Sequence, residues 1–448
     1  MTGGQVTSTA LIQLDSKRAN LMRYDTAVIL KRFYFCERQI AIAEAGWIAG
    51  TAPLLLKIGY AQLMWEDAQA ADAMRARVFE LRYPSRLLEK GDEEPLITFL
   101  DEIRHAPNAL ALYLTLVDLL KPALRDAYQA YLDLADNIGD GPSMRFMQSA
   151  LRDKEDQIAR LTAFRGDMLN VSEDERRTAF DWLAEAKAML DNLGGIGLDK
   201  VETPPSPDPI QLRGKRPFSV AQVPAREAAY ANVRFYWPDI IVEDYAYGEG
   251  LMLQLRSAIS HINEVWAIEA CSHFTYAFAD LLPWEFFVDA TRWTYDEARH
   301  CRMGYERLRD WGYEKHEIPL GTYIYDAAKD EDPIYRLGML YFFETKNIGK
   351  KPKRRDKFLE YGDSLSQHDM DFDWADETIH ANYGNHWLSV VQKTRGEAAD
   401  PNQVRDHCHA LVDTIVATAT DEEREQVLAL AQNMVDKAQV IIGTSAIS

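Results

Sequence analysis

The 448-residue sequence is short of the features that mark secreted and membrane proteins. It has 4 cysteines (Cys36, Cys271, Cys301 and Cys408), and no two of them form a Cys-x-x-Cys pair. Such sparse cysteines are typical of reduced, buried thiols rather than of a disulfide framework. No stretch approaches the run of about 20 apolar residues that a membrane-spanning helix needs. The N-terminus also lacks a basic-then-apolar secretion signal. We therefore expect a cytoplasmic protein that does not enter a membrane.

Positive charge is also in short supply, because 50 lysines and arginines face 70 aspartates and glutamates, giving a net charge of -20. An acidic chain repels phosphate backbones, which argues against nucleic-acid binding. The exception is the basic run Lys350-Lys351-Pro352-Lys353-Arg354-Arg355. This run could meet an anion, but we interpret it as a solvated loop.

Clear alternation of apolar and polar residues, the pattern of a half-buried strand, is missing. Apolar residues instead recur at intervals of three and four, so the sequence predicts an all-α fold. In the first half, helices are expected near residues 25–49, 54–83, 106–137, 142–165 and 172–193. In the second half, they are expected near residues 248–281, 283–311, 333–347, 362–395, 401–418 and 420–440.

The pattern of helices breaks between Thr203 and Pro224, where six prolines exclude a continuous helix. This break divides the chain into parts. We predict an N-terminal helical bundle, a proline-rich linker, a second helical bundle and a C-terminal helical extension. Their expected bounds are residues 1–202, 203–224, 225–395 and 396–448.

Two copies of Asp-Glu-x-x-His, at residues 296–300 and 376–380, are the strongest chemical signal. Residues three apart project from nearly the same face of a helix, so each copy offers a carboxylate and an imidazole to one point. Two further predicted helices carry one glutamate each, Glu264 and Glu344. The glutamate of each motif follows the upstream glutamate by 33 residues. The equal spacing predicts two helical hairpins that present their polar groups at the same height.

These polar residues share helix faces with apolar residues, so we expect them to be buried. Buried carboxylates are costly unless they are paired, and two divalent cations would neutralise four glutamates. Carboxylate and imidazole ligands without thiolate suit iron or manganese better than structural zinc. The sequence therefore predicts a dimetal site.

Several neighbours of these residues have expected supporting roles. Asp296 and Asp376 are placed to accept a hydrogen bond from a ligand histidine, on the same helix or across the site. His386 follows His380 by six residues, which places it about 120° around the helix from the side that carries His380. We therefore expect it beside the metal-binding residues or at the surface. Glu269 is the alternative to Glu264, and we favour Glu264 because it lies on the apolar stripe.

The paired motifs resemble the ferritin-like diiron-carboxylate superfamily, in which two helices give one Glu each and two others give Glu-x-x-His. Over roughly residues 250–390, a bacterial ferritin-like family without an established activity is more similar still. The motifs that carry this resemblance are Asp296 to His300, Glu344-Thr345-Lys346, Tyr361-Gly362-Asp363, Asp376 to His380 and Gly384-Asn385-His386-Trp387. The resemblance implies a ferritin-like four-helix bundle over residues 225–395 that holds two iron ions, or a manganese and an iron ion. The implied ligands are Glu264, Glu297, His300, Glu344, Glu377 and His380.

This resemblance also implies a function. Diiron sites with open positions activate O₂, so we expect a non-haem oxidase or oxygenase that oxidises or hydroxylates a small molecule with electrons from a donor. The sequence does not identify catalytic residues, and it leaves a homodimer open. The alternatives are a non-enzymatic iron-binding or storage protein and a peroxide-detoxifying protein.

The first half of the chain is similar to a second copy that has lost its metal ligands. Trp65-Glu66-Asp67-Ala68-Gln69 parallels the first Asp-Glu-x-x-His motif, with glutamine in place of histidine. Lys154-Glu155-Asp156-Gln157-Ile158 parallels the second motif, with isoleucine in that place, and Glu37 would match Glu264. We therefore expect no metal in this half. An unrelated helical bundle is the alternative.

Overall fold

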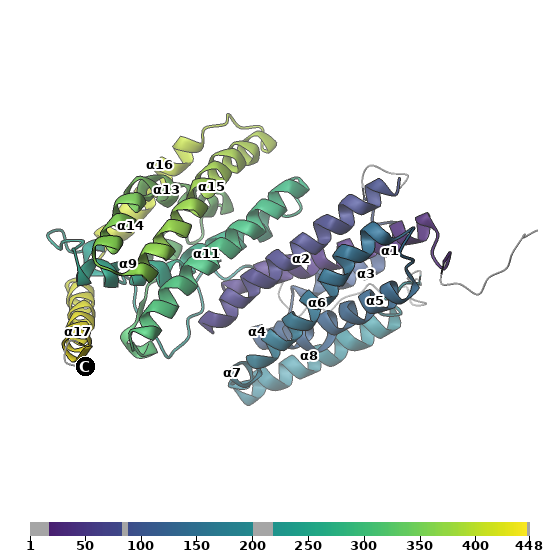
Figure 1. The fold of residues 1–448 in the computed structure, drawn as a ribbon, viewed down its shortest axis with the longest axis horizontal. Coiled ribbons are helices and arrows are strands. Elements are labelled where there is room, and N and C mark those ends of the chain that lie inside the picture. The colour runs from purple at the N-terminus through teal and green to yellow at the C-terminus, as the bar shows by residue number, and fades with distance from the viewer. Residues whose placement is uncertain (1–17, 83–87, 200–217, 446–448) are drawn as a thin grey trace, which may run out of the picture.

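The computed structural model describes residues 18–82, 88–199 and 218–445. These residues are mostly helical, which confirms the predicted all-α class (Figure 1). Two short strands, β1 (Ala231–Asn232) and β2 (Pro319–Leu320), pair in parallel and were not predicted. Five of the six prolines between residues 203 and 224 lie outside the described residues.

The N-terminal half is built around α1 (Arg23–Ile48) and α2 (Leu54–Glu80), which pack against each other. Helix α6 (Gly141–Ala163) packs on both α2 and α5 (Lys121–Leu134). The helix expected over residues 106–137 is divided, because a π-helical turn at Leu116–Leu120 joins α4 (Ala109–Thr115) to α5. The remaining helices of this half are α3 (Glu94–Ile103), α7 (Arg165–Leu169) and α8 (Glu173–Asn192).

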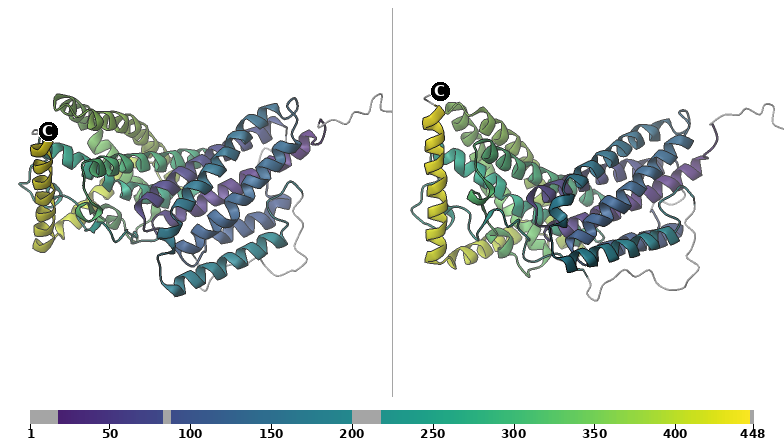
Figure 2. Two further views of the ribbon diagram at one scale, coloured as in Figure 1. Left: turned by 60° about the horizontal axis from the view of Figure 1, so that its bottom comes forward. Right: turned by 90° about the horizontal axis from the view of Figure 1, so that it is seen from below.

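In the C-terminal half, five helices surround the predicted metal ligands. They are α9 (Leu251–Asn263), α10 (Val265–Phe278), α11 (Trp284–Asp310), α13 (Pro333–Asn347) and α15 (Ser364–Thr394). Helix α11 packs on α9, α10 and α15, and α13 packs on α10 and α15. The outer helices are α12 (Tyr323–Ala327), α14 (Lys351–Glu360), α16 (Pro401–Ala417) and α17 (Asp421–Ser445). Helix α17 stands at the end of the molecule, where it packs against α9 (Figure 2).

The single helix predicted over residues 248–281 is broken at Glu264, which separates α9 from α10. Glu264 has a ψ angle of 2°, outside the helical range. The preceding side chain holds this break in place. Asn263 donates to the carbonyl of Pro319 at 2.9 Å and accepts from the backbone N–H of Gly321 at 2.7 Å. The β2 segment therefore fixes the point at which the Glu264 side chain leaves the helix.

Helices α9 and α11 approach closely at Gly304. A Cβ atom on Gly304 would lie 2.2 Å from the backbone nitrogen of Ile262 and 2.5 Å from the carbonyl oxygen of Ala258. Since no side chain fits there, the glycine allows the helix backbones to touch. This contact brings Glu264 on one side within reach of the Asp-Glu-x-x-His motif on the other.

The two halves share an extensive apolar and aromatic contact, in which α2 packs against α11 (Figure 1) and α1 packs against α10. The rings of Trp65 and Tyr295 stack across it with centroids 4.9 Å apart. The indole N–H of Trp284 donates to Asp72 at 2.7 Å. The N-terminal half therefore supports the helix that carries the first predicted metal motif.

The structure agrees with the expected state of the cysteines, because all four are buried and free. None of the helices in the described part of the chain is long and apolar enough to cross a bilayer.

Candidate metal centre

The structure brings the predicted ligands together from four directions. Glu264 comes from the α9–α10 junction, Glu344 from α13, and one Glu-x-x-His pair each from α11 and α15. Five of these six residues are buried, and the side chain of Glu264 is 16% exposed. Buried polar groups without partners are costly, so their convergence needs a balancing interaction.

The donor atoms form two triads that share Glu297. Glu264, Glu297 and His300 make one triad, and Glu297, Glu344 and His380 make the other, each with its donor atoms within 4.8 Å of one another. The Oε2 atom of Glu297 lies 3.7 Å from Nδ1 of His300, and its Oε1 atom lies 3.2 Å from Nδ1 of His380. A carboxylate that faces two imidazoles in this way is placed to bridge two cations.

Several of these donor atoms have no hydrogen-bond partner. Nδ1 of His300, Nδ1 of His380 and one carboxylate oxygen each of Glu264, Glu344 and Glu377 are buried without one. Native interiors rarely leave such atoms unsatisfied, because each costs about 1–3 kcal/mol. A pair of metal ions would use these atoms, so the residues fit the group that the motifs predict.

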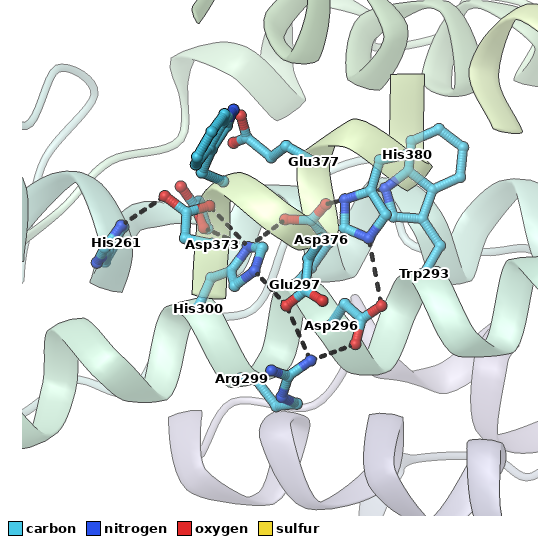
Figure 3. A network of polar contacts seen from close by, with 12 residues as sticks. His261, Trp293, Asp296, Glu297, Arg299, His300, Asp373, Asp376, Glu377 and His380 are labelled. Carbon is cyan, nitrogen blue, oxygen red and sulfur yellow. Dashed lines mark hydrogen bonds and ion pairs between the residues drawn. The ribbon is translucent and has the colours of Figure 1, made fainter. Parts of the chain in front are cut away.

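The hydrogen bonds expected from the two aspartates are present, and they run across the site (Figure 3). Asp376 lies 3.2 Å from Nε2 of His300, and Asp296 lies 3.4 Å from Nε2 of His380. Each aspartate holds a proton on Nε2 and so leaves Nδ1 free to face the carboxylates. Arg299 forms an ion pair with both aspartates.

The pKa values of the cluster are shifted because several acidic side chains are buried close together. Burial raises the pKa of Glu264 and that of Glu344 to about 7, although a histidine beside each carboxyl opposes the shift. Burial acts in the same direction on Glu297, but the neighbouring His300 and His380 outweigh it and lower its pKa. The surrounding carboxylates raise the pKa of both histidines despite their burial. Without cations, the cluster must therefore hold protons.

Glu377 belongs to neither triad, because its Oε1 atom pairs with the ammonium of Lys351. Lys351 also donates to Oδ1 of Asp373 at 2.6 Å. The basic run at residues 350–355 is therefore not a solvated loop, since it begins α14 with a buried lysine. No signal in the sequence marks Lys351 as a neighbour of the acids.

Asp373 is a second residue that the sequence reasoning did not assign to the site. It lies 3.5 Å from Nδ1 of His300 and 3.1 Å from Nε2 of His261. Together with His261 and Glu264, it forms a third group of donor atoms that could hold a metal. The available signal was its position, four residues before Glu377 on the same helix face.

Two other candidates lie away from the centre. Glu269 pairs with Lys57 and Arg226, which leaves Glu264 as the glutamate that faces the histidines. His386 is exposed and packs against Trp387, with ring centroids 4.5 Å apart. The structure therefore places His386 at the surface and not beside the ligands.

A cavity of about 350 Å³ opens onto the candidate centre. Glu264, Glu297, Glu344 and Glu377 form part of its wall. Trp266 and Phe343 add an apolar surface, and their rings lie 5.2 Å apart. This volume is in the range of pockets that bind small organic molecules.

The N-terminal half holds a buried charge cluster of a different composition. Its members are Glu37, Glu44, Asp67, Lys121 and Lys154, all with at most 1% exposure. Lys121 pairs with Glu44 and Asp67, and Lys154 pairs with Glu37 and Asp67. Two ammonium groups therefore neutralise the acids, and the described residues of this half contain no group of donor atoms suited to a metal.

The alignment predicted for this half is displaced by one residue. Gln69, which was matched to a ligand histidine, is exposed, whereas Asp67 points inward. On α6, the inward residues are Lys154 and Gln157, each one position before the predicted match. Lys154 follows Lys121 by 33 residues, the interval found between Glu344 and Glu377.

Residues 222–426 match a family model described as a protein of unknown function, DUF455. The matched segment contains all six predicted ligands, Asp373 and Lys351. No curated protein and no solved structure matches the chain. The similarity therefore covers the candidate centre and carries no named activity.

Proposed function

We propose that the chain is a ferritin-like diiron-carboxylate protein that uses O₂ to oxidise or hydroxylate a small molecule. The observation that carries this proposal is the position of Glu297, whose two oxygens face one histidine each between the two triads. A carboxylate in this position can bridge two metal ions. The helices of the ferritin-like bundle would be α9 with α10, α11, α13 and α15.

The donor set supports iron as the metal. The five residues of the two triads, Glu264, Glu297, His300, Glu344 and His380, would hold the pair together with Glu377, whose carboxylate would exchange Lys351 for a metal. Oxygen and imidazole donors without thiolate suit iron or manganese. Cys271 is buried nearby, and burial, reinforced by the charge of Glu297, raises the pKa of its thiol well above the usual range, but its Sγ atom belongs to none of the groups of donor atoms in the described residues. A thiolate ligand is therefore not part of the proposal.

Bound iron would supply the redox chemistry with O₂, and a separate donor would supply electrons. The residues of this chain set the conditions for it. Asp296 and Asp376 orient the two imidazoles, and the indole N–H of Trp293 donates to Oε1 of Glu297 at 2.9 Å. The walls at Trp266 and Phe343 keep part of the cavity apolar, which suits a substrate held beside the metals.

Metal analysis of the full-length protein tests the centre. We expect two iron ions per chain, and we expect Glu297→Ala and His380→Ala to lose them while circular dichroism stays helical. The control is Glu306→Ala on the same helix, because Glu306 pairs with Arg302 at the surface. Two metals retained in both ligand variants would refute the ligand set.

Single-turnover uptake of O₂ by the reduced, iron-loaded protein tests the activity. We expect uptake in proportion to the iron pair, and its loss in the Glu297→Ala variant. A protein that binds two irons but consumes no O₂ would contradict the oxidase function. Many irons per chain would instead indicate storage.

A further inference from the structure

The cavity beside the candidate metal centre has many cations in its wall. Apart from the carboxylates of the centre, the lining contains two acids, Asp239 and Asp413. Lys351 pairs with Asp373 and Glu377 of the centre, and the lining contains four further cations: Arg256, Lys346, Lys350 and Arg354. Seven acids and five cations line the cavity as a whole, so the excess of positive charge belongs to the end of the cavity away from the centre. A basic region of a cavity attracts anions and raises their local concentration.

Arg256 is the cation whose bonding is least complete. It is 7% exposed, its Nε donates to Asp239 at 3.0 Å, and its guanidinium lies over the ring of Tyr247 at 4.9 Å. Its Nη1 group is buried without a hydrogen-bond partner. Because a buried guanidinium N–H is costly to leave unpaired, an acceptor supplied by a ligand would satisfy it.

Helix α14 turns one face of the basic run toward the same cavity. Lys351 and Arg354 line it and lie three residues apart on α14, and Lys350, the residue before the helix, lines it as well. Arg354 and Arg256 contact the same aromatic ring, because the guanidinium of Arg354 lies 4.3 Å from the ring centre of Tyr247. Lys350 is exposed, and it forms no ion pair with a carboxylate in the described part of the chain.

The cavity connects these cations to the metal centre along α9. Arg256, Ser260 and Glu264 all line it and follow each other at intervals of four residues. Eight residues of helix span about 12 Å. An oxyanion at Arg256 would therefore leave the rest of a small molecule beside the carboxylate cluster.

We propose that the cavity binds a small organic anion, with its carboxylate or phosphate group on Arg256 and Arg354 and its apolar part toward the candidate metals. The role of this anion as a substrate rests on the proposed function, but its binding does not. The basic run interpreted from sequence as a solvated loop is, in this proposal, one wall of the anion site.

Binding to the full-length protein as isolated tests the proposal by calorimetry, and a repeat with the protein loaded with iron(II) under anaerobic conditions shows whether the metal changes the affinity. The probes are octanoate, octyl phosphate, octanol and octylamine, which share one chain and differ in the charge of the head group. We expect one of the two anions to bind at least about tenfold more tightly than octanol, and the tighter anion identifies the head group. Equal or tighter binding of octanol or octylamine would overturn the proposal, as would no binding of either anion at millimolar concentration.

Variants locate the anion. Arg256→Gln should weaken anion binding by about tenfold to a hundredfold, because a charged hydrogen bond is lost. Arg354→Gln, which is less buried, should weaken it by a few-fold and keeps the test valid if the first variant folds poorly. The matched control is Lys353→Gln, which removes the same charge from an exposed position on the same helix outside the cavity.

The outcomes separate this inference from the proposed function. If Lys353→Gln weakens binding as much as Arg354→Gln, the anion site is wrong, whatever the protein does with O₂. If the anion binds as expected but the reduced protein consumes no O₂, the anion site stands and the oxidase function fails.

Discussion

At the scale of single residues, the candidate centre depends on hydrogen bonds that fix each histidine. Asp376 holds Nε2 of His300, so Nδ1 is the nitrogen that faces the carboxylates. We predict that Asp376→Asn lowers iron affinity by about tenfold to a hundredfold, because it weakens this orientation without removing a ligand. A competition titration with a chelator measures the change.

The control for this prediction is Asp371→Asn on the same helix. Asp371 is exposed and pairs with Arg355 outside the centre. Equal affinities of the Asp371 and Asp376 variants would mean that the aspartate does not support the histidine.

Some residues of the centre could be predicted from the sequence and others could not. Equal 33-residue spacings singled out Glu264, Glu297, Glu344 and Glu377, because equal spacing in two helical hairpins places these residues at the same level along the bundle. Lys351 could not be found in this way. Its burial arises from the packing of α14 on α15, and no local sequence pattern predicts this contact.

At the scale of helices, the contact between α9 and α11 depends on Gly304. We predict that Gly304→Ala destabilises the protein by about 3 kcal/mol, because the added methyl group would meet backbone atoms of α9 that have no room to move. The same change should lower metal content, since it displaces Glu264 from Glu297. Chemical denaturation and metal analysis measure the two effects.

Gly59→Ala is the matched control, because Gly59 lies inside α2 with no atom within 4 Å of an added Cβ. That substitution should stabilise the protein by about 0.5–1 kcal/mol through the helix backbone alone. A Gly304→Ala variant as stable as Gly59→Ala would show that the close approach is not required.

Helix positions were largely predictable, and the exceptions have a physical cause. The pattern over residues 283–311 corresponds to α11 (Trp284–Asp310), because apolar spacing follows the face that is buried. The break at Glu264 was not predictable, since apolar residues continue on both sides of it. Its cause is Asn263, whose partners Pro319 and Gly321 lie more than 50 residues away in the sequence.

At the scale of the whole molecule, the two halves balance buried acids in different ways. In the N-terminal half, Lys154 neutralises Glu37 and Asp67. We predict that Lys154→Met destabilises the protein by about 3–5 kcal/mol, because it leaves buried carboxylates without their cation. Iron content should stay at the wild-type level.

The exposed pair Lys187–Asp191 provides the comparison, and Lys187→Met should change stability by less than about 1 kcal/mol. Loss of iron from a folded Lys154→Met protein would contradict a metal-free N-terminal cluster. Denaturant titration and metal analysis of the same samples decide between these outcomes.

The contact between the halves contains a lysine that makes stability depend on pH. Lys57 of α2 pairs with Glu269 of α10, but Arg226 pairs with the same carboxylate. Burial, together with the charge of Arg226, lowers the pKa of Lys57 to about 8. The unfolded chain keeps this proton up to a pH of about 10.4. Between these values the unfolded state binds more protons, so the contribution of Lys57 to stability rises with pH.

We therefore predict that wild type gains stability relative to Lys57→Met, on the order of 2 kcal/mol, between a pH of about 7.5 and a pH of about 10. The variant keeps Glu269 paired, because Nη2 of Arg226 lies 2.9 Å from its Oε2 atom. Denaturant unfolding of both proteins at each pH isolates the effect, since all other groups titrate in both. Parallel curves for the two proteins would mean that Lys57 keeps an ordinary pKa in the folded state and that the contact between α2 and α10 does not titrate.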